Sequence, residues 1–137
     1  MRMRAAGAAL AAALSLVLAG CSDVEDAAKD AAGDAACSVA RQAMDEAATQ
    51  AEQAVGDLGA DPAAAKRELT ALRDALKTLE GRVDGESGGK VTQARKALDR
   101  LVTQADVARA GTPVDQQAVD DAQSDLDSAV EDFRDVC

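Results

Sequence analysis

The stretch that decides the fold is PAAAKRELTALRDALKTLEGRV, residues 62–83. Its apolar residues recur at steps of three and four, which is the period of one helical face and not the two-residue alternation of a strand. They are Ala65, Leu69, Leu72, Leu76, Leu79 and Val83. Asp61 precedes a proline, as an N-cap precedes Pro at the first helical position, so an amphipathic helix is predicted from Pro62 onward.

Three other segments repeat this spacing. The first has Cys37, Ala40, Met44, Ala47, Ala51, Ala54 and Leu58. The third in chain order has Val91, Ala94, Leu98, Leu101, Ala105 and Ala108, and the last has Val119, Ala122, Leu126, Ala129, Phe133 and Val136. Four such segments joined by short breaks predict an all-α fold, a small antiparallel up-and-down bundle of four helices, or of three plus an N-terminal helix.

Glycine and proline mark the breaks at 56–62, 84–89 and 111–113. Gly111 is placed to end the third helix, and Thr112 before Pro113 is placed to cap the fourth. Because the first stripe is almost all Ala, its helix should approach its neighbours closely while burying little area per residue.

Two cysteines stand at the ends of this pattern. Cys37 opens the first stripe and Cys137 follows the last, and an up-and-down bundle brings these two ends to the same pole. We therefore predict that one disulfide closes the bundle. A redox-active pair is the alternative, but it calls for a nearby cation or a Cys-x-x-Cys spacing, and acidic residues flank both thiols instead.

The N-terminal segment has the layout that is typical of a secretory signal peptide. Met1–Arg4 is short and basic, Ala5–Ala19 carries no charge, and the segment ends in Leu18-Ala19-Gly20-Cys21. This ending resembles the lipobox of bacterial lipoproteins. The resemblance implies that residues 1–20 are removed, that Cys21 is diacylated on sulfur, and that the chain is anchored at the extracytoplasmic face of the bacterial cell membrane. An ordinary signal peptide with an incidental cysteine is the alternative.

The composition, rich in Ala, Arg, Asp, Val and Gly, resembles that of high-GC bacteria such as actinomycetes. Beyond the lipobox, the mature domain resembles no family whose functional residues carry over.

The expected organisation is a lipoprotein signal peptide at 1–20, an acidic tether at 21–36 and a helical bundle at 37–137. Ser22 and Glu25 fit a capping box, which favours a helical tether, whereas Gly33 weakens that case. The sequence does not decide whether residues 22–36 form a helix or a flexible tether.

Charge is unevenly distributed. The chain has 15 Lys and Arg against 25 Asp and Glu, with no His, for a net of −10. Such a charge argues against nucleic acid as a partner. The acids of the last helix form a candidate partner face, Asp120, Asp121, Asp125, Asp127 and Asp132, with a merely solvated surface as the alternative. Basic residues of the two central helices either contact an anionic wall polymer or pair with acids one turn away, as Lys77 with Asp74.

No catalytic residues, cofactor or metal ligands are expected. Without His, acid–base chemistry would need a carboxyl group with a raised pKa in a cleft, and the acids fall on predicted polar faces. The favoured function is a membrane-anchored, non-enzymatic structural or protein or cell-wall interaction module. A lipoprotein that binds a small ligand or a cation is the alternative, and the oligomeric state is open.

Overall fold

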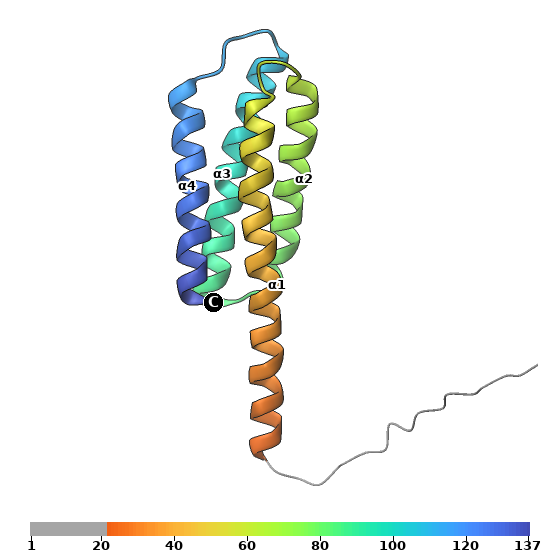
Figure 1. Cartoon of the computed structure of the whole chain (residues 1–137), viewed down its shortest axis with the longest axis vertical. Helices are drawn as coiled ribbons and strands as arrows, with labels where there is room; N and C mark the ends of the chain where they lie inside the picture. Colours follow the sequence, from red (N-terminus) through yellow and green to blue (C-terminus); the bar gives the residue numbers. More distant parts are fainter. Residues whose placement is uncertain (1–21) are drawn as a thin grey trace, which may run out of the picture.

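The computed structural model describes residues 22–137, and the surroundings of side chains from residue 33 onward. The described chain forms four helices that run alternately up and down (Figure 1). They are α1 (Ser22–Gly56), α2 (Pro62–Glu80), α3 (Gly85–Arg109) and α4 (Gln116–Val136). The predicted all-α, four-helix bundle is confirmed.

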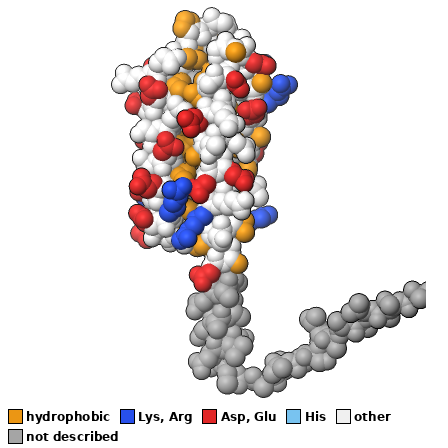
Figure 2. Space-filling view, in the orientation of Figure 1, with side chains coloured by type: hydrophobic (Ala, Val, Ile, Leu, Met, Phe, Trp, Pro, Cys, Tyr) orange, Lys and Arg blue, Asp and Glu red, His pale blue; other side chains and the backbone are white. Residues whose placement is uncertain are grey.

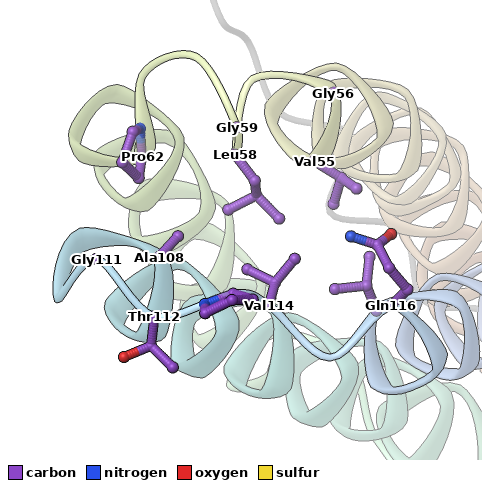
Figure 3. Close-up of a pocket in the computed structure, with 12 residues that line it drawn as sticks. Val55, Gly56, Leu58, Gly59, Pro62, Ala108, Gly111, Thr112, Val114 and Gln116 are labelled. Atoms are coloured by element: carbon purple, nitrogen blue, oxygen red, sulfur yellow. The ribbon is translucent and has the colours of Figure 1, made fainter.

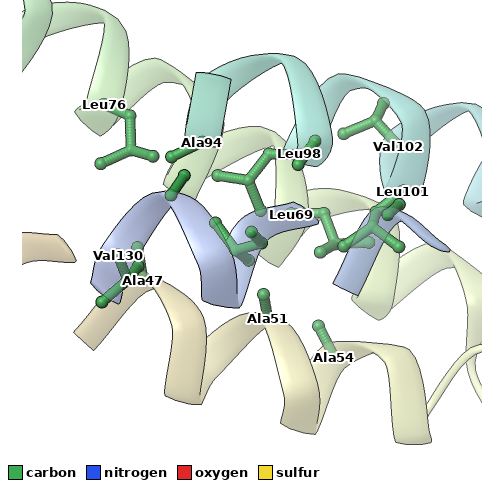
Figure 4. Close-up of a cluster of buried hydrophobic side chains, with 14 of the residues drawn as sticks. Ala47, Ala51, Ala54, Leu69, Leu76, Ala94, Leu98, Leu101, Val102 and Val130 are labelled. Atoms are coloured by element: carbon green, nitrogen blue, oxygen red, sulfur yellow. The ribbon is translucent and has the colours of Figure 1, made fainter. Parts of the chain in front are cut away.

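The four helices do not pack equally. α3 makes the most extensive contacts, with α2 on one side and α4 on the other, whereas α1 contacts α2 and α4 less extensively and its diagonal neighbour α3 least. The cause is visible in the core, where Ala47, Ala51 and Ala54 of α1 turn toward larger leucines of the other helices (Figure 4). Short side chains bring little apolar area out of water, so α1 is the most weakly held wall of the bundle.

The predicted core stripes are largely confirmed. Phe133 and Met44 are among the largest side chains that are fully buried. Three buried residues were missed, namely Ala97, Val102 and Val130. They widen the apolar faces of α3 and α4, the pair of helices that, with α2 and α3, makes the most extensive contacts in the bundle. Val136 was placed in the last stripe, yet its side chain is 37% exposed at the end of α4.

Helix α2 starts where the sequence predicts. The Asp61 side chain accepts a hydrogen bond from the Ala64 amide at 2.9 Å, and Pro62 occupies the first helical turn. This arrangement satisfies one of the amides that a helix start leaves without a partner.

The predicted break at 84–89 is wrong in extent, because α3 already begins at Gly85. Gly85 takes φ +64°, which glycine tolerates, and the chain enters the helix directly. A Cβ on Gly88 would lie 2.8 Å from the Val83 carbonyl oxygen, so the tight entry needs glycine there as well. The glycines therefore form the first turn of α3 and not a loop.

The predicted cap of the last helix is also displaced. Gly111 follows the end of α3 with φ +77°, as expected, but Thr112 and Pro113 remain in the loop. Asp115 is the cap, and its carboxylate accepts from the Ala118 amide at 3.1 Å. Its own amide donates to Gln104 Oε1 at 3.0 Å, a contact from α3 that Thr112 does not receive.

The predicted disulfide is present between Cys37 and Cys137, whose Cα atoms are 5.4 Å apart. It joins α1 to the end of α4 at the pole that also holds the α2–α3 connection (Figure 1). We call this end the disulfide pole and the opposite end, formed by the α1–α2 and α3–α4 loops, the loop pole.

Helix α1 does not stop at the disulfide pole. It is one continuous helix from Ser22 to Gly56, and its first part stands clear of the other three helices (Figure 1). The first fully buried side chain is Ala40, while residues 33–36 are exposed. We call residues 22–36 the stalk. Of the two tether alternatives, the helical one is therefore observed.

The lipobox and Cys21 lie outside the described residues. Among the helices that are described, none combines the length and the apolar character needed to cross a membrane.

Candidate functional site

The predicted acidic face of α4 is divided between two sides of the helix. Asp125 binds Arg100 at 2.5 Å, and Asp132 binds Lys90 at 2.7 Å. Both partners belong to α3, so these two carboxylates bridge α3 and α4. The structure therefore places these two carboxylates beside α3, whose basic side chains match their charge.

Asp120 and Asp127 lie on the other side of α4, toward α1. Together with Glu52 of α1 and Glu131 of α4, they line a hollow of about 470 Å³ between the two helices. We call this hollow the acidic groove, lined by Ala48, Ala51, Glu52, Asp120, Gln123, Ser124, Leu126, Asp127, Ser128 and Glu131. No Lys or Arg is among these lining residues, but Asp127 and Glu131 also line the adjoining hollow that includes Arg134.

The floor of the acidic groove is apolar and its walls are acidic. Figure 2 shows apolar side chains running along the bundle between α4 and α1, with acidic side chains on both sides. Ala51 and Leu126 form part of this floor and belong to the core. Because these two side chains are only 0% and 1% exposed, the surface that the groove offers is chiefly that of its acidic and polar walls.

Toward the disulfide pole the character of this surface changes. A second hollow of about 480 Å³ continues the groove and includes Asp45, Val130 and Arg134. Arg134 binds Asp45 at 2.6 Å across α4 and α1, and Arg41 donates to the Arg134 carbonyl oxygen at 3.4 Å. The basic side chains of Arg41 and Arg134 therefore lie at this end of the groove.

Asp121 is adjacent to Asp120 in sequence but does not line the groove. It is exposed, and within the described residues no ion pair involves it. Successive residues of a helix point about 100° apart, which is why these two neighbours face different surroundings. The five predicted acids are thus split into Asp120 and Asp127 at the groove, Asp125 and Asp132 at α3, and Asp121 at neither.

The basic residues of α2 and α3 are largely paired with acids. Lys66 binds Asp106 at 2.5 Å, and Arg95 binds Glu80 at 2.8 Å. Arg73 binds Asp74 at 2.9 Å, so the predicted pair of Asp74 with Lys77 is wrong. The interpretation of these bases as partners for acids one turn away holds for Arg95, which binds Asp99 at 3.1 Å. Lys66 and Arg100 instead bind acids of a neighbouring helix, and Arg73 binds the next residue in the chain.

Two of these pairs perturb their carboxyl groups. The pKa of Glu80 is lowered, chiefly by a hydrogen bond from Thr92 and then by Arg95. The pKa of Asp106 is lowered, chiefly by a hydrogen bond from Lys66. Both shifts keep the group ionised, whereas a general acid at neutral pH needs a raised pKa.

A further hollow, of about 720 Å³, lies at the loop pole. Val55 and Leu58 point into it from the α1 end and the first loop, and Val114 faces them from the α3–α4 loop (Figure 3). Its volume is within the range of about 300 to 1,000 Å³ that is usual for small-ligand pockets. We call it the loop-pole pocket.

No group of three or more Cys, Asp or Glu side chains in the described part of the chain is arranged to hold a metal ion. The core of that part contains no buried charged or polar residue.

Sequence reasoning missed Glu52 as a wall of the groove. The sequence feature that could have indicated Glu52 is its position directly after Ala51, at the border of the first apolar stripe. That border position alone does not tell whether a residue faces α4 or α2.

No family model, curated protein or solved structure matches this chain.

Proposed function

We propose that this protein is a bacterial lipoprotein, anchored through Cys21 at the extracytoplasmic face of the cell membrane, whose bundle is a non-enzymatic interaction module. The observation that carries the proposal is the stalk, a helix that begins at Ser22, next to the proposed lipid site, and runs on into the bundle. Two or three acyl chains suffice for stable anchoring.

The stalk sets the distance between membrane and bundle. At about 1.5 Å per residue, residues 22–36 extend roughly 22 Å. Their sequence carries five acids and one Lys, so anionic lipid headgroups repel the stalk and favour its projection from the surface. Since the stalk leaves from the disulfide pole, the loop pole and the acidic groove stay accessible to partners.

The disulfide agrees with this location, because disulfides persist in oxidising compartments and are rare in the cytosol. A binding role agrees with the surface chemistry. The two carboxyl groups with lowered pKa values, Glu80 beside Thr92 and Arg95 and Asp106 beside Lys66, are held ionised and line none of the hollows described above, whereas the acidic groove is a shaped surface with four acidic side chains in its walls.

Metabolic labelling with an alkyne fatty acid tests the anchor. We expect the full chain to take up label and to fractionate with membranes, and we expect Cys21→Ala to lose the label and leave the membrane fraction. The double variant Cys37→Ser/Cys137→Ser is the matched control, since it also removes thiols and should keep both label and membrane association. Labelling of Cys21→Ala at the level of the native chain would refute the anchor.

The loop-pole pocket supports a second candidate function, the binding of a small apolar ligand. Its volume and its valine, leucine and proline lining suit such a ligand. A ligand that binds only the folded state raises the melting temperature, so thermal unfolding in the presence of an apolar ligand library tests this candidate. Val114→Asp should abolish any shift, because it places a charge in the lining.

A further inference from the structure

We propose that the disulfide between Cys37 and Cys137 is a redox-sensitive clasp, whose reduction releases α1 while α2, α3 and α4 stay packed together. This goes beyond the interaction role proposed above. The release of α1 does not depend on the lipid anchor, so either proposal can fail while the other stands.

Helices α2, α3 and α4 are joined to one another by ion pairs along their length. Lys66, Arg73 and Glu80 of α2 bind Asp106, Asp99 and Arg95 of α3, and Lys90 and Arg100 of α3 bind Asp132 and Asp125 of α4. Of the large side chains that are fully buried within residues 33–137, only Met44 belongs to α1. The other three helices therefore supply most of the core and hold one another independently of α1.

Helix α1 is attached to this unit by fewer polar contacts. Within residues 33–137, each hydrogen bond or ion pair between α1 and another helix involves Arg134. The guanidinium of Arg134 binds Asp45 at 2.6 Å, and its carbonyl oxygen accepts from Arg41 at 3.4 Å. An exposed ion pair contributes little to stability. Apart from Met44 the buried residues of α1 are alanines, which remove little apolar area from water. The disulfide is therefore the strongest single link between α1 and α4.

The disulfide is placed to control this attachment. Cys37 precedes Ala40, the first buried residue of α1, and Cys137 follows the end of α4. At its other end α1 continues into α2 through residues 57–61. The intact disulfide thus holds both ends of the packed part of α1, whereas reduction leaves one of these ends free.

Both cysteines are partly exposed, so a reductant can approach their sulfur atoms. The reductant is a dithiol, either a small molecule or a protein. One thiolate of the dithiol attacks a sulfur atom of the disulfide, the S–S bond breaks, and the other cysteine leaves as a thiolate that takes up a proton. The second thiol of the dithiol then attacks the mixed disulfide. The dithiol ends as a disulfide, and its two protons and two electrons end on Cys37 and Cys137.

The acidic residues that flank Cys37 and Cys137 do not oppose this step. They disfavour the thiolate form of the two cysteines, which a redox catalyst would need as its own nucleophile. In the proposed step the attacking thiolate belongs to the reductant. The pair therefore acts as a switch that another thiol operates and not as a catalyst.

Hydrogen exchange read by mass spectrometry tests the clasp on the full chain. The measured quantity is the exchange rate of amides 44–54 in α1 divided by that of amides 94–105 in α3. We expect a dithiol, added without denaturant, to raise this ratio by about tenfold or more, because α1 opens while α3 stays packed. A ratio that reduction leaves unchanged would mean that the disulfide stabilises all helices alike, and it would overturn the proposal. Reduction that succeeds only in urea would overturn it as well.

The double variant Cys37→Ser/Cys137→Ser separates the loss of the disulfide from other effects of the dithiol. It should show the raised ratio without reductant, and the dithiol should change it no further. A ratio equal to that of the oxidised native chain would refute the clasp. Fatty-acid labelling of Cys21 reports separately on the anchor.

Two arginines provide matched variants. Arg134→Gln removes the ion pair between α4 and α1, whereas Arg100→Gln removes one between α3 and α4, and each variant loses one positive charge. In the reduced protein Arg134→Gln should raise the exchange ratio further, by about two- to fivefold, the effect of one exposed ion pair. Arg100→Gln should not raise it. Equal ratios in the two variants would contradict the assignment of α1 as the helix that separates.

Discussion

Cys37 and Cys137 are separated by 100 positions in the chain and by 5.4 Å between their Cα atoms. Their disulfide ties α1, the most weakly packed helix, to the last residue after α4. It therefore reinforces the bundle where the alanine-rich stripe of α1 provides the least apolar burial, and it fixes both helices that form the acidic groove.

Removal of this disulfide should destabilise the bundle strongly. For a closed loop of about 100 residues, the chain-entropy estimate is about 4.7 kcal/mol. We expect urea unfolding of Cys37→Ser/Cys137→Ser to show a loss of this order. Reductant should lower the stability of the native chain to that of the variant and leave the variant unchanged. Equal midpoints for native chain and variant would contradict the prediction.

Replacement of Phe133 by Ala should destabilise the bundle more than replacement of Val136 by Ala, although the sequence pattern treats the two positions as equivalent. Phe133 is fully buried and Val136 is 37% exposed, although both fit the last apolar stripe. Phe133→Ala should lower the free energy of unfolding by about 3 to 5 kcal/mol, because it leaves a cavity in the core. Val136→Ala is the control and should lose less than about 1 kcal/mol. Similar losses at the two positions would show that the end of α4 packs differently.

Two neighbouring glycines in the first turn of α3 should respond in opposite directions. A Cβ on Gly89 meets nothing within 4 Å, so Gly89→Ala should stabilise by about 0.5 kcal/mol through reduced entropy of the unfolded chain. A Cβ on Gly88 would lie 2.8 Å from the Val83 carbonyl oxygen, so Gly88→Ala should destabilise. Thermal unfolding of both variants gives the comparison. A gain in stability from Gly88→Ala would show that the entry to α3 can relax without cost.

The helical stripes and the disulfide could be predicted from the sequence, whereas the start of α3 and the cap of α4 could not. The spacing of Leu69 and Leu76, or of Cys37 and Cys137, follows from the helical period and the antiparallel topology, so the bundle and its disulfide were predictable. The start of α3 at Gly85 depends on the backbone approach between Gly88 and Val83, and the cap at Asp115 depends on Gln104 of another helix. Such contacts between distant residues leave no periodic signal.

The candidate site was predictable only in part for a related reason. Composition places acids on the first and last helices, which are neighbours in an up-and-down bundle, and the acidic groove lies between them. Which acids remain unpaired depends on the direction each one faces, and only the packed structure separates Asp120 from Asp125. The charge on α4 was therefore predictable, but its division between groove and ion pairs was not.

The stability contributed by Glu80 should depend on pH. Its pKa is lowered in the folded state by Thr92 and Arg95, so the ionised form stabilises the bundle at pH values above the unfolded pKa of about 4.3. This contribution is lost as the pH falls through the lowered pKa of the folded state. Glu80→Gln should therefore lower the melting temperature by a constant small amount from pH 7 to about pH 5, and the difference from the native chain should shrink below about pH 4.

Melting curves of both proteins at several pH values provide this difference, and the subtraction cancels the effect of the many other acids. Glu68→Gln on the exposed side of α2 is the control for the loss of one negative charge, because no ion pair involves Glu68 within residues 33–137. If the difference for Glu80→Gln grew as the pH fell, the ion pair with Arg95 would not be the source of its stabilisation. A difference equally large for Glu68→Gln would mean that net charge, and not the contact between α2 and α3, sets the stability.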